Sequence, residues 1–462
     1  MPLRRTLPTL ILLTSALITA CGALPSPQAS TNQPGKVAPR YGYVASVPLL
    51  PGDSPASVQR ALGGVVITWD ASGCAAGFAE HCTALLGFDG ITAQRLRALA
   101  VGTGRSVYIE PNKDVFSGGG TITATIGGAR SLWAGGNISA WAGGARSLWA
   151  GGTFSLLPQN TTLWTNVKLQ QAQSRAPNLG AGVTVAIIDT GIDLNHPAFQ
   201  GTLTDPSTWY DFYAADAVPQ DEGTLGVGGY GHGSNVAGIV LQIAPKAKIM
   251  PLRVLGPDGS GDVATVAQAI TWAVSKGANV INLSLGSKDD SVVVNDAIHK
   301  AMDKGVLVTA SAGNDNQEKI TYPAAQAGTP AFQASISVGS VNLQDQKSSF
   351  SNYGHQLEIV APGENVYAPA PGNLMAAWSG TSMAAPMAAG AFALALGQTL
   401  SSQPAPGPAS PGPAQPGTTG SLPTQLINTS VNIYTGDLNK AYKDKLGKGR
   451  LDLNAFLNAV VK

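Results

Sequence analysis

The feature that most constrains the fold is the stretch GTSMAAPMAAGAFALAL at residues 380–396, where a turn of small residues opens a long apolar, alanine-rich run. A run without a polar face predicts a buried helix, and Ser382 lies at its N-terminus. Free backbone N–H groups and the helix dipole favour negative charge there, so Ser382 is a candidate nucleophile. The alternative is that Gly380 and the alanines serve only close helix packing.

A second segment, VAIIDTGID at residues 185–193, predicts a buried strand that ends in a carboxylate. Its four apolar residues lead directly into Asp189. In open α/β sheets, ligands and chemistry gather beyond the carboxyl ends of the strands, so Asp189 is a candidate functional residue.

A third segment, GHGSNVAG at residues 231–238, contains His232 between two glycines, directly before an apolar helical pattern. His232 is therefore predicted to open a helix. A single histidine beside glycines is often an ordinary surface residue, but the chain has only five histidines. This one completes a set of Asp, His and Ser.

The order Asp189, His232, Ser382 resembles that of the subtilisin-like serine proteases. The resemblance extends from about residue 163 to residue 457. It is also carried by APKAKIMPLRVL at 244–255, VINLSLG at 280–286, SAGND at 311–315, SFSNYG at 349–354 and APG at 361–363. It implies a three-layer α/β fold with a mainly parallel sheet, preceded by a small α+β prosegment domain, and the activity of a serine endopeptidase.

The resemblance also implies a role for each candidate catalytic residue. His232 takes the proton of Ser382 as the hydroxyl attacks a peptide carbonyl, and Asp189 orients the imidazole. Asn314, in SAGND, matches the family's side-chain donor to the oxyanion, with the backbone N–H of Ser382 as its partner. The alternative for Asn314 is a turn residue beside Gly313. This chemistry requires no cofactor.

Two further segments match the strands between which the family holds an extended peptide, by addition of a strand to exposed backbone edges. The substrate-binding candidates are Gly259, Ser260, Gly261, Ser284, Leu285 and Gly286. The alternative for both segments is an ordinary loop. Thr321 stands where many members have glycine at the primary specificity pocket, which predicts a narrower pocket.

The chain departs from the family's pattern at a few positions. The usual HGTHVAG is replaced by HGSNVAG, which places Ser234 and Asn235 beside the triad and predicts different supporting hydrogen bonds. No metal ligand is assigned, but an acidic loop leaves structural calcium open beside the alternative of a solvated loop. The acids of this loop are Asp211, Asp216, Asp221 and Glu222.

Residues 1–20 hold two arginines and then an apolar run too short to span a membrane as a mature helix, a pattern typical of a signal peptide. The run ends in LITAC, which resembles a bacterial lipobox and makes Cys21 the predicted lipidation site, before an exposed linker at 21–40. We therefore expect an extracytoplasmic protein that is anchored in the membrane through Cys21. The alternative is ordinary signal-peptidase cleavage and a secreted protein.

Three cysteines make an odd number, and lipidation of Cys21 would leave Cys74 and Cys82 as a pair in an oxidising compartment. The pair is a candidate short-loop disulfide, with free buried thiols as the alternative. A formal net charge of +1 with 12% charged residues gives no electrostatic reason to expect nucleic acid as a partner.

Residues 41–120 alternate short apolar runs with helical stretches and predict a small α+β domain. Its position and its YIEPN ending resemble the prosegment of subtilases, an inhibitor whose C-terminal tail occupies the substrate groove until it is cut. The alternative is an adhesion or spacer domain. We expect the cut between Phe116 and Trp164.

Glycine pairs recur every eight residues at 121–152, in TITATIGG, ARSLWAGG, NISAWAGG and ARSLWAGG. This octad repeat disfavours helix, and its even period places the tryptophans on one face of an extended chain. It predicts a strand that docks on the catalytic domain, a carbohydrate or hydrophobic surface, or a linker that is cut during maturation. A proline-rich loop at 403–423 is predicted to interrupt the catalytic domain at 160–462.

These observations predict a self-processing, secreted or surface-anchored serine endopeptidase that acts on proteins or peptides. Two other classes stay open: a catalytically silent peptide-binding protein, and an adhesin that binds through the tryptophan repeat. The presence of Asp189, His232, Asn314 and Ser382 argues against the first. For the second, binding should survive deletion of residues 160–462.

Overall fold

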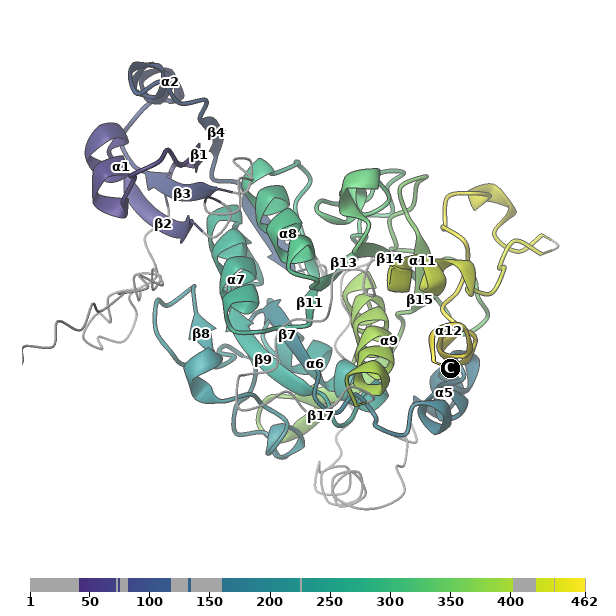
Figure 1. Cartoon of the computed structure of the whole chain (residues 1–462). Helices are drawn as coiled ribbons and strands as arrows, with labels where there is room; N and C mark the ends of the chain where they lie inside the picture. The colour runs from purple at the N-terminus through teal and green to yellow at the C-terminus, as the bar shows by residue number, and fades with distance from the viewer. Residues whose placement is uncertain are drawn as a thin grey trace, which may run out of the picture.

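The computed structural model describes most of two domains. The described residues are 41–71, 74, 82–117, 132–133, 160–224, 227–401, 421–435 and 437–461. The predicted signal peptide, Cys21, the linker at 21–40, nearly all of the octad repeat and most of the proline-rich loop lie outside them. Figure 1 shows a small domain, residues 41–117, beside helices α7 (Val263–Ser275) and α8 (Val292–Asp303) of a large domain that begins at residue 160.

The described residues of the small domain form one antiparallel sheet, of strand order β2-β3-β1-β4, and two α-helices. Its elements are β1 (Tyr43–Pro48), α1 (Pro55–Leu62), β2 (Val65–Asp70), β3 (Thr83–Phe88), α2 (Ala93–Gly102) and β4 (Tyr108–Pro111). Ala45, Val47 and Leu86 share a core with both helices. Because side chains alternate along a strand, Val44 and Leu85 point the other way, and they belong to a hydrophobic core of the large domain.

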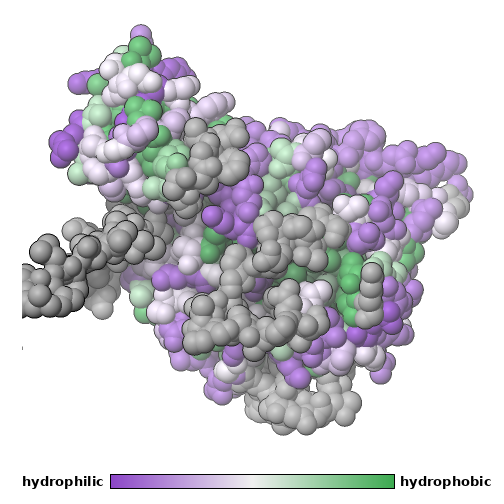
Figure 2. All heavy atoms as spheres, viewed as in Figure 1, coloured by the Kyte–Doolittle hydropathy of each residue, from purple (hydrophilic) through white to green (hydrophobic). Residues whose placement is uncertain are grey.

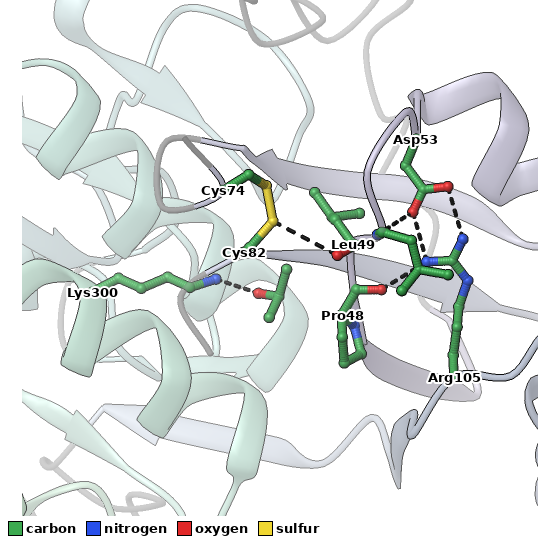
Figure 3. The surroundings of a disulfide bond; sticks show 9 residues. Pro48, Leu49, Asp53, Cys74, Cys82, Arg105 and Lys300 are labelled. Carbon is green, nitrogen blue, oxygen red and sulfur yellow. Dashed lines mark hydrogen bonds and ion pairs between the residues drawn. A yellow bond between two sulfur atoms is a disulfide. The ribbon is translucent and has the colours of Figure 1, made fainter. Parts of the chain in front are cut away.

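A covalent link and an ion pair hold the loops of the small domain together (Figure 3). Cys74 and Cys82 form a disulfide, with their Cα atoms 5.0 Å apart. Arg105 makes a bidentate ion pair with Asp53, with N–O distances of 2.6 and 2.7 Å, and it also donates a hydrogen bond to the Pro48 carbonyl. The hydrogen bonds from Arg105 lower the pKa of Asp53 from its ordinary value.

A seven-stranded parallel sheet forms the centre of the large domain, in the order β15-β14-β13-β11-β7-β9-β8. Its strands are β7 (Thr184–Asp189), β8 (Tyr210–Asp211), β9 (Lys248–Arg253), β11 (Val280–Leu283), β13 (Leu307–Ser311), β14 (Ser335–Val341) and β15 (Ile359–Pro362). Along β7, Val185 and Ile187 belong to one hydrophobic core, whereas Ala186 and Ile188 belong to another. Both faces of the sheet are therefore buried, and the predicted three-layer α/β fold is confirmed.

Helices cover each face of this sheet. Residues of α6 (His232–Ile243) and α9 (Thr381–Ser401) contribute to the first core, and residues of α7 and α8 to the second. The other α-helices among the described residues of this domain are α4 (Thr161–Asn166), α5 (Leu169–Arg175), α11 (Ser421–Asn428), which begins inside the predicted proline-rich loop, and α12 (Leu453–Val460). No helix in the described ranges combines the length and the apolar character needed to cross a membrane.

Helix α9 is the buried helix that the alanine-rich run predicts, and its residues from Met383 to Leu396 are buried. Pro386 lies inside it and has no N–H to donate to the carbonyl one turn earlier, at Ser382. That carbonyl accepts a hydrogen bond from the Ser284 hydroxyl at 2.8 Å instead. The start of α9 is thereby tied to one of the predicted substrate-binding segments.

A further antiparallel sheet joins β16 (Val366–Ala370), β17 (Leu374–Trp378) and the two-residue strand β6 (Leu132–Trp133). Trp133 faces Ala376 in the backbone register. One octad therefore contributes a short strand beside the large domain, as the docking prediction requires, while the role of the whole repeat stays a prediction.

Candidate active site

The end of β7 and the start of α6 bring Asp189 and His232 together. Gly231, with φ of +91°, makes the turn into α6 that most side chains would oppose, so His232 is the first helical residue. His232 Nδ1 lies 2.7 Å from Asp189 Oδ1, and both side chains are fully buried. The same carboxylate oxygen accepts from the backbone N–H of Thr190 at 2.8 Å. The imidazole is thus anchored through one of its two nitrogens.

The other imidazole nitrogen of His232 faces no hydrogen-bond partner in the described part of the chain. The hydroxyl of Ser382, at the start of α9, donates to the carbonyl of Ser284 at 3.2 Å. The hydrogen bond between Ser382 and His232 is therefore not formed in this state. Catalytic hydrogen bonds often form only when substrate binds. The Trp378 and His232 rings pack in a T-shaped arrangement, with ring centroids 5.6 Å apart at 81°.

Asn314 directs its amide nitrogen toward the turn before Ser382. Its oxygen accepts hydrogen bonds from the backbone N–H and the hydroxyl of Thr381, at 2.8 and 3.0 Å, which fixes the orientation of the amide. The nitrogen is buried without a partner among the described residues, and a Cβ on Gly380 would lie 3.2 Å from it. A buried, unpaired donor is costly in free energy, and an oxygen that becomes negative would satisfy it.

The two segments predicted to bind substrate hold a strand of the chain itself. Strand β5 (Asp114–Ser117) lies between β10 (Ser260–Asp262) and β12 (Leu285–Gly286), antiparallel to both. The paired residues are Ser260 with Phe116, Gly261 with Val115, Leu285 with Ser117, and Gly286 with Phe116. Gly259 and Ser284 directly precede the two outer strands. The predicted edges are thus able to grip an extended peptide through its backbone.

Side chains of β5 alternate between the protein and the solvent. Val115 is 3% exposed and lines an apolar pocket together with Val263, Val266 and Leu285. Phe116 is 47% exposed. An extended peptide in this position would therefore place every second side chain against the large domain.

Thr321 fills the space between two glycines close to this edge. A Cβ on Gly286 would lie 2.6 Å from the Thr321 hydroxyl, and a Cβ on Gly313 would lie 2.7 Å from its methyl group. The hydroxyl donates to the Ser311 carbonyl at 3.2 Å. The space next to Gly286 is thus occupied by a threonine side chain, and a narrowed specificity pocket stays our prediction.

The four acids at the end of β8 and in the loop between β8 and α6 have different partners. Arg253, at the end of β9, forms ion pairs with Asp211 at 3.0 Å and with Glu222 at 2.9 Å. Burial raises the pKa of Asp211 to about 6. Asp216 accepts from the backbone N–H of Val218, and Asp221 faces α6. The described residues contain no group of three His, Cys, Asp or Glu side chains that could hold a metal ion, so structural calcium stays an untested expectation.

Sequence reasoning missed the roles of Arg253 and Asp221. The signal for Arg253 is its place in IMPLRVL, where a cation stands between four apolar residues and two more. Buried cations need anionic partners, so this arginine predicts acids nearby. In HGSNVAG, Ser234 donates to Asp221 at 3.1 Å and Asn235 donates to the carbonyl of Ala376 at 3.2 Å; that these bonds differ from those of other family members stays a prediction.

Comparison with known proteins identifies the family. Residues 180–430, more than half of the chain, match the model of the subtilase family. Subtilisin BL from Lederbergia lenta is 40% identical over 224 residues, which cover 46% of this chain and 76% of that protein. Thermitase from Thermoactinomyces vulgaris is 37% identical over 241 residues, which cover 50% of this chain and 81% of that protein. The chain therefore belongs to the subtilase family and is a serine endopeptidase that acts on proteins or peptides.

Proposed function

We propose that this endopeptidase uses Ser382 as nucleophile, His232 as general base and Asp189 as the residue that orients His232. The observation that carries the proposal is the buried Asp189–His232 hydrogen bond, which leaves the second imidazole nitrogen unpaired. A serine hydroxyl is a weak nucleophile near neutral pH, so it needs such a base.

The reaction begins when the Ser382 oxygen attacks the peptide carbonyl and its proton passes to Nε2 of His232. Asp189 stabilises the imidazolium that forms. The carbonyl oxygen becomes negative and accepts hydrogen bonds from Asn314 Nδ2 and the Ser382 backbone N–H. His232 then protonates the leaving amine, which departs from the acyl-enzyme. In the second half of the reaction water attacks the acyl carbonyl, His232 takes a proton from the water, and it returns a proton to the Ser382 oxygen as the acid product leaves.

We further propose that the small domain is a prosegment that inhibits the enzyme and assists its folding. Its tail supplies β5, which occupies both predicted substrate edges. Glu110 accepts from the Ser291 hydroxyl at 2.9 Å and from the Val293 N–H at 3.0 Å, at the start of α8. Asn112 accepts from the Ala264 N–H at 3.1 Å, at the start of α7. The Val293 and Ala264 N–H groups lie in the first turn of their helices, where no carbonyl of the same helix can accept from them. The small domain supplies the acceptors.

The register of β5 supports a position for self-cleavage. Ser117 faces Leu285, and the residue before Leu285 is Ser284, whose carbonyl accepts from the Ser382 hydroxyl at 3.2 Å. A strand that continues past Ser117 in this register would bring its next peptide group to Ser382. We therefore propose that the chain is cut shortly after Ser117, in the glycine sequence at 118–120.

Labelling with a fluorophosphonate tests the nucleophile directly. We expect the wild-type enzyme to hydrolyse casein and to carry the label on Ser382, as read by peptide mass spectrometry. Ser382→Ala should lose both the label and casein hydrolysis. A label on another serine, or casein hydrolysis by the variant, would remove Ser382 from the reaction.

Export and anchoring through a lipidated Cys21 is a separate proposal, supported by the lipobox-like sequence LITAC. Mass spectrometry of the membrane fraction should find a diacylglyceryl group on Cys21, and Cys21→Ala should move the protein out of that fraction. A mature N-terminus without lipid would contradict anchoring and leave the proteolytic mechanism unaffected.

A further inference from the structure

A buried acid lies next to the Asp189–His232 pair and takes no part in the reaction proposed above. Asp221 is 2% exposed. Its oxygen Oδ2 accepts two hydrogen bonds, from the backbone N–H of Gly231 and from the hydroxyl of Ser234, both at 3.1 Å. Its oxygen Oδ1 is buried without a partner within the described ranges. The nearby guanidinium of Arg253 forms its ion pairs with Asp211 and Glu222.

The two groups that bind Asp221 flank His232 in the sequence. Gly231 directly precedes His232, and Ser234 follows it by two residues. The Ser234 hydroxyl also accepts from the backbone N–H of Asp193 at 2.9 Å, in the turn that follows β7. A continuous path of hydrogen bonds thus joins the first turn of α6 to the turn behind Asp189, with Asp221 at its centre.

The backbone of Asp221 is itself fixed in place. Its N–H donates to the Ile192 carbonyl at 3.0 Å, and the N–H of Ile192 donates to the Pro219 carbonyl at 3.0 Å. A Cβ on Gly191 would lie only 2.9 Å from the Asp221 nitrogen, so the two segments are in close contact. An acid held this firmly can fix the groups that it binds.

The surroundings of Asp221 raise its pKa. Burial is the main cause that raises its pKa well above the ordinary value, and the Asp189 carboxylate on β7 acts in the same direction. The hydrogen bonds from Gly231 and Ser234 and the charge of Arg253 on β9 oppose this rise. Tyr230, just before α6, also interacts electrostatically with Asp221.

We propose that Asp221 is a positioning residue that ties the first turn of α6 to the turn after β7 and so orients His232 toward Asp189. The proposal rests on the proposed function, because the orientation of His232 affects the rate only if His232 is the general base.

Two substitutions separate positioning from charge. Asp221→Ala removes the acceptor for Gly231 and Ser234, and we expect kcat on a peptide substrate to fall roughly tenfold to a hundredfold while KM changes by less than about threefold. Asp221→Asn is neutral and keeps an acceptor oxygen, so its kcat and its pH profile should stay within about threefold of the wild type. Asp205→Asn, at an exposed acid that binds only its own turn, is the matched control.

A second measurement does not depend on self-processing or activity. In full-length Ser382→Ala, the strongly deshielded proton of the His232–Asp189 hydrogen bond can be followed by NMR. We expect Asp221→Ala to shift or broaden this signal and Asp221→Asn to preserve it. An unchanged signal and kcat in Asp221→Ala, or equal damage in Asp221→Asn, would overturn the proposal. If the wild type fails to hydrolyse casein, the proposed function fails, and the NMR comparison still decides the positioning of His232.

Discussion

The two domains differ in what covers their sheets. The large domain buries both faces of its sheet under its own helices. The small domain covers one face with α1 and α2, and on the other face it places Val44 and Leu85 in a core of the large domain. The small domain therefore depends on its neighbour for part of its stability, whereas the large domain contains a complete set of layers.

The small domain also leaves large apolar side chains exposed at its surface. Apolar side chains reach its surface in Figure 2, and its exposed large apolar residues are Leu50, Val65, Leu99, Val101, Tyr108 and Phe116. A disulfide and the Arg105–Asp53 ion pair hold its loops. Small domains bury a smaller share of their surface and often need such links. A cut after Ser117 would therefore leave a small domain of marginal stability, which suits temporary binding to the large domain.

A single substitution in the large domain should be enough to damage the reaction. Asn314→Ala should lower kcat by roughly a hundredfold or more, because one oxyanion donor contributes about 3–4 kcal/mol in the transition state. KM should change little, since β10 and β12 still bind the substrate backbone. Steady-state kinetics on a peptide substrate measure both constants. A loss confined to KM would remove Asn314 from the oxyanion site.

The inhibitory part of the small domain should depend on one face of β5. Residues 41–117, added to processed enzyme, should inhibit it competitively. Val115→Asp should weaken that inhibition at least tenfold, because burying a valine contributes about 1.5–3 kcal/mol. Phe116→Asp is the matched control on the exposed face and should change inhibition by less than about threefold. Equal effects of the two substitutions would contradict the register of β5.

A fall in pH should change the stability of the two domains in opposite directions. This is the smallest of the three effects predicted from the comparison of the domains. Asp53 has a lowered pKa in the folded small domain, so its stabilisation is present above its ordinary pKa of 3.8 and is lost as the pH falls below it. Asp211 has a pKa raised to about 6, so the large domain loses stability as the pH rises from 3.8 to about 6.

Hydrogen exchange in full-length Ser382→Ala, followed by mass spectrometry between pH 6 and pH 3, separates the domains. Protection in the small domain should fall toward pH 3, and Asp53→Asn should reduce that fall. A fall of the same size in Asp53→Asn would show that the Arg105–Asp53 pair does not control the acid response of the small domain.

The sequence predicted the functional residues that lie at one end of a single strand or helix. Asp189 ends an apolar strand run, His232 follows a glycine that opens a helix, and Ser382 opens an alanine-rich helix. These patterns are local, and the resemblance to the family places them in one fold. The three-layer fold was implied by that resemblance.

Other features depend on partners that are distant in the sequence. The register of β5 is set by two segments more than 140 residues further along the chain, and no local pattern in 114–117 specifies it. The sequence left Asp221 open as a calcium ligand or as an acid of a solvated loop, but it is buried and accepts hydrogen bonds from Gly231 and Ser234. The partners of Arg253 are likewise acids from a loop whose path the sequence did not predict.

The central claim is that Ser382 cuts its own chain after the strand that β10 and β12 hold. Intact mass and N-terminal sequence of the purified wild type and of Ser382→Ala test it most directly. We predict that the wild type yields a new N-terminus within residues 118–120 and that Ser382→Ala keeps residues 41–117 joined to the large domain. A fully active wild type with an uncut chain, or a Ser382→Ala protein cut at the same bond when expressed alone, would contradict the claim.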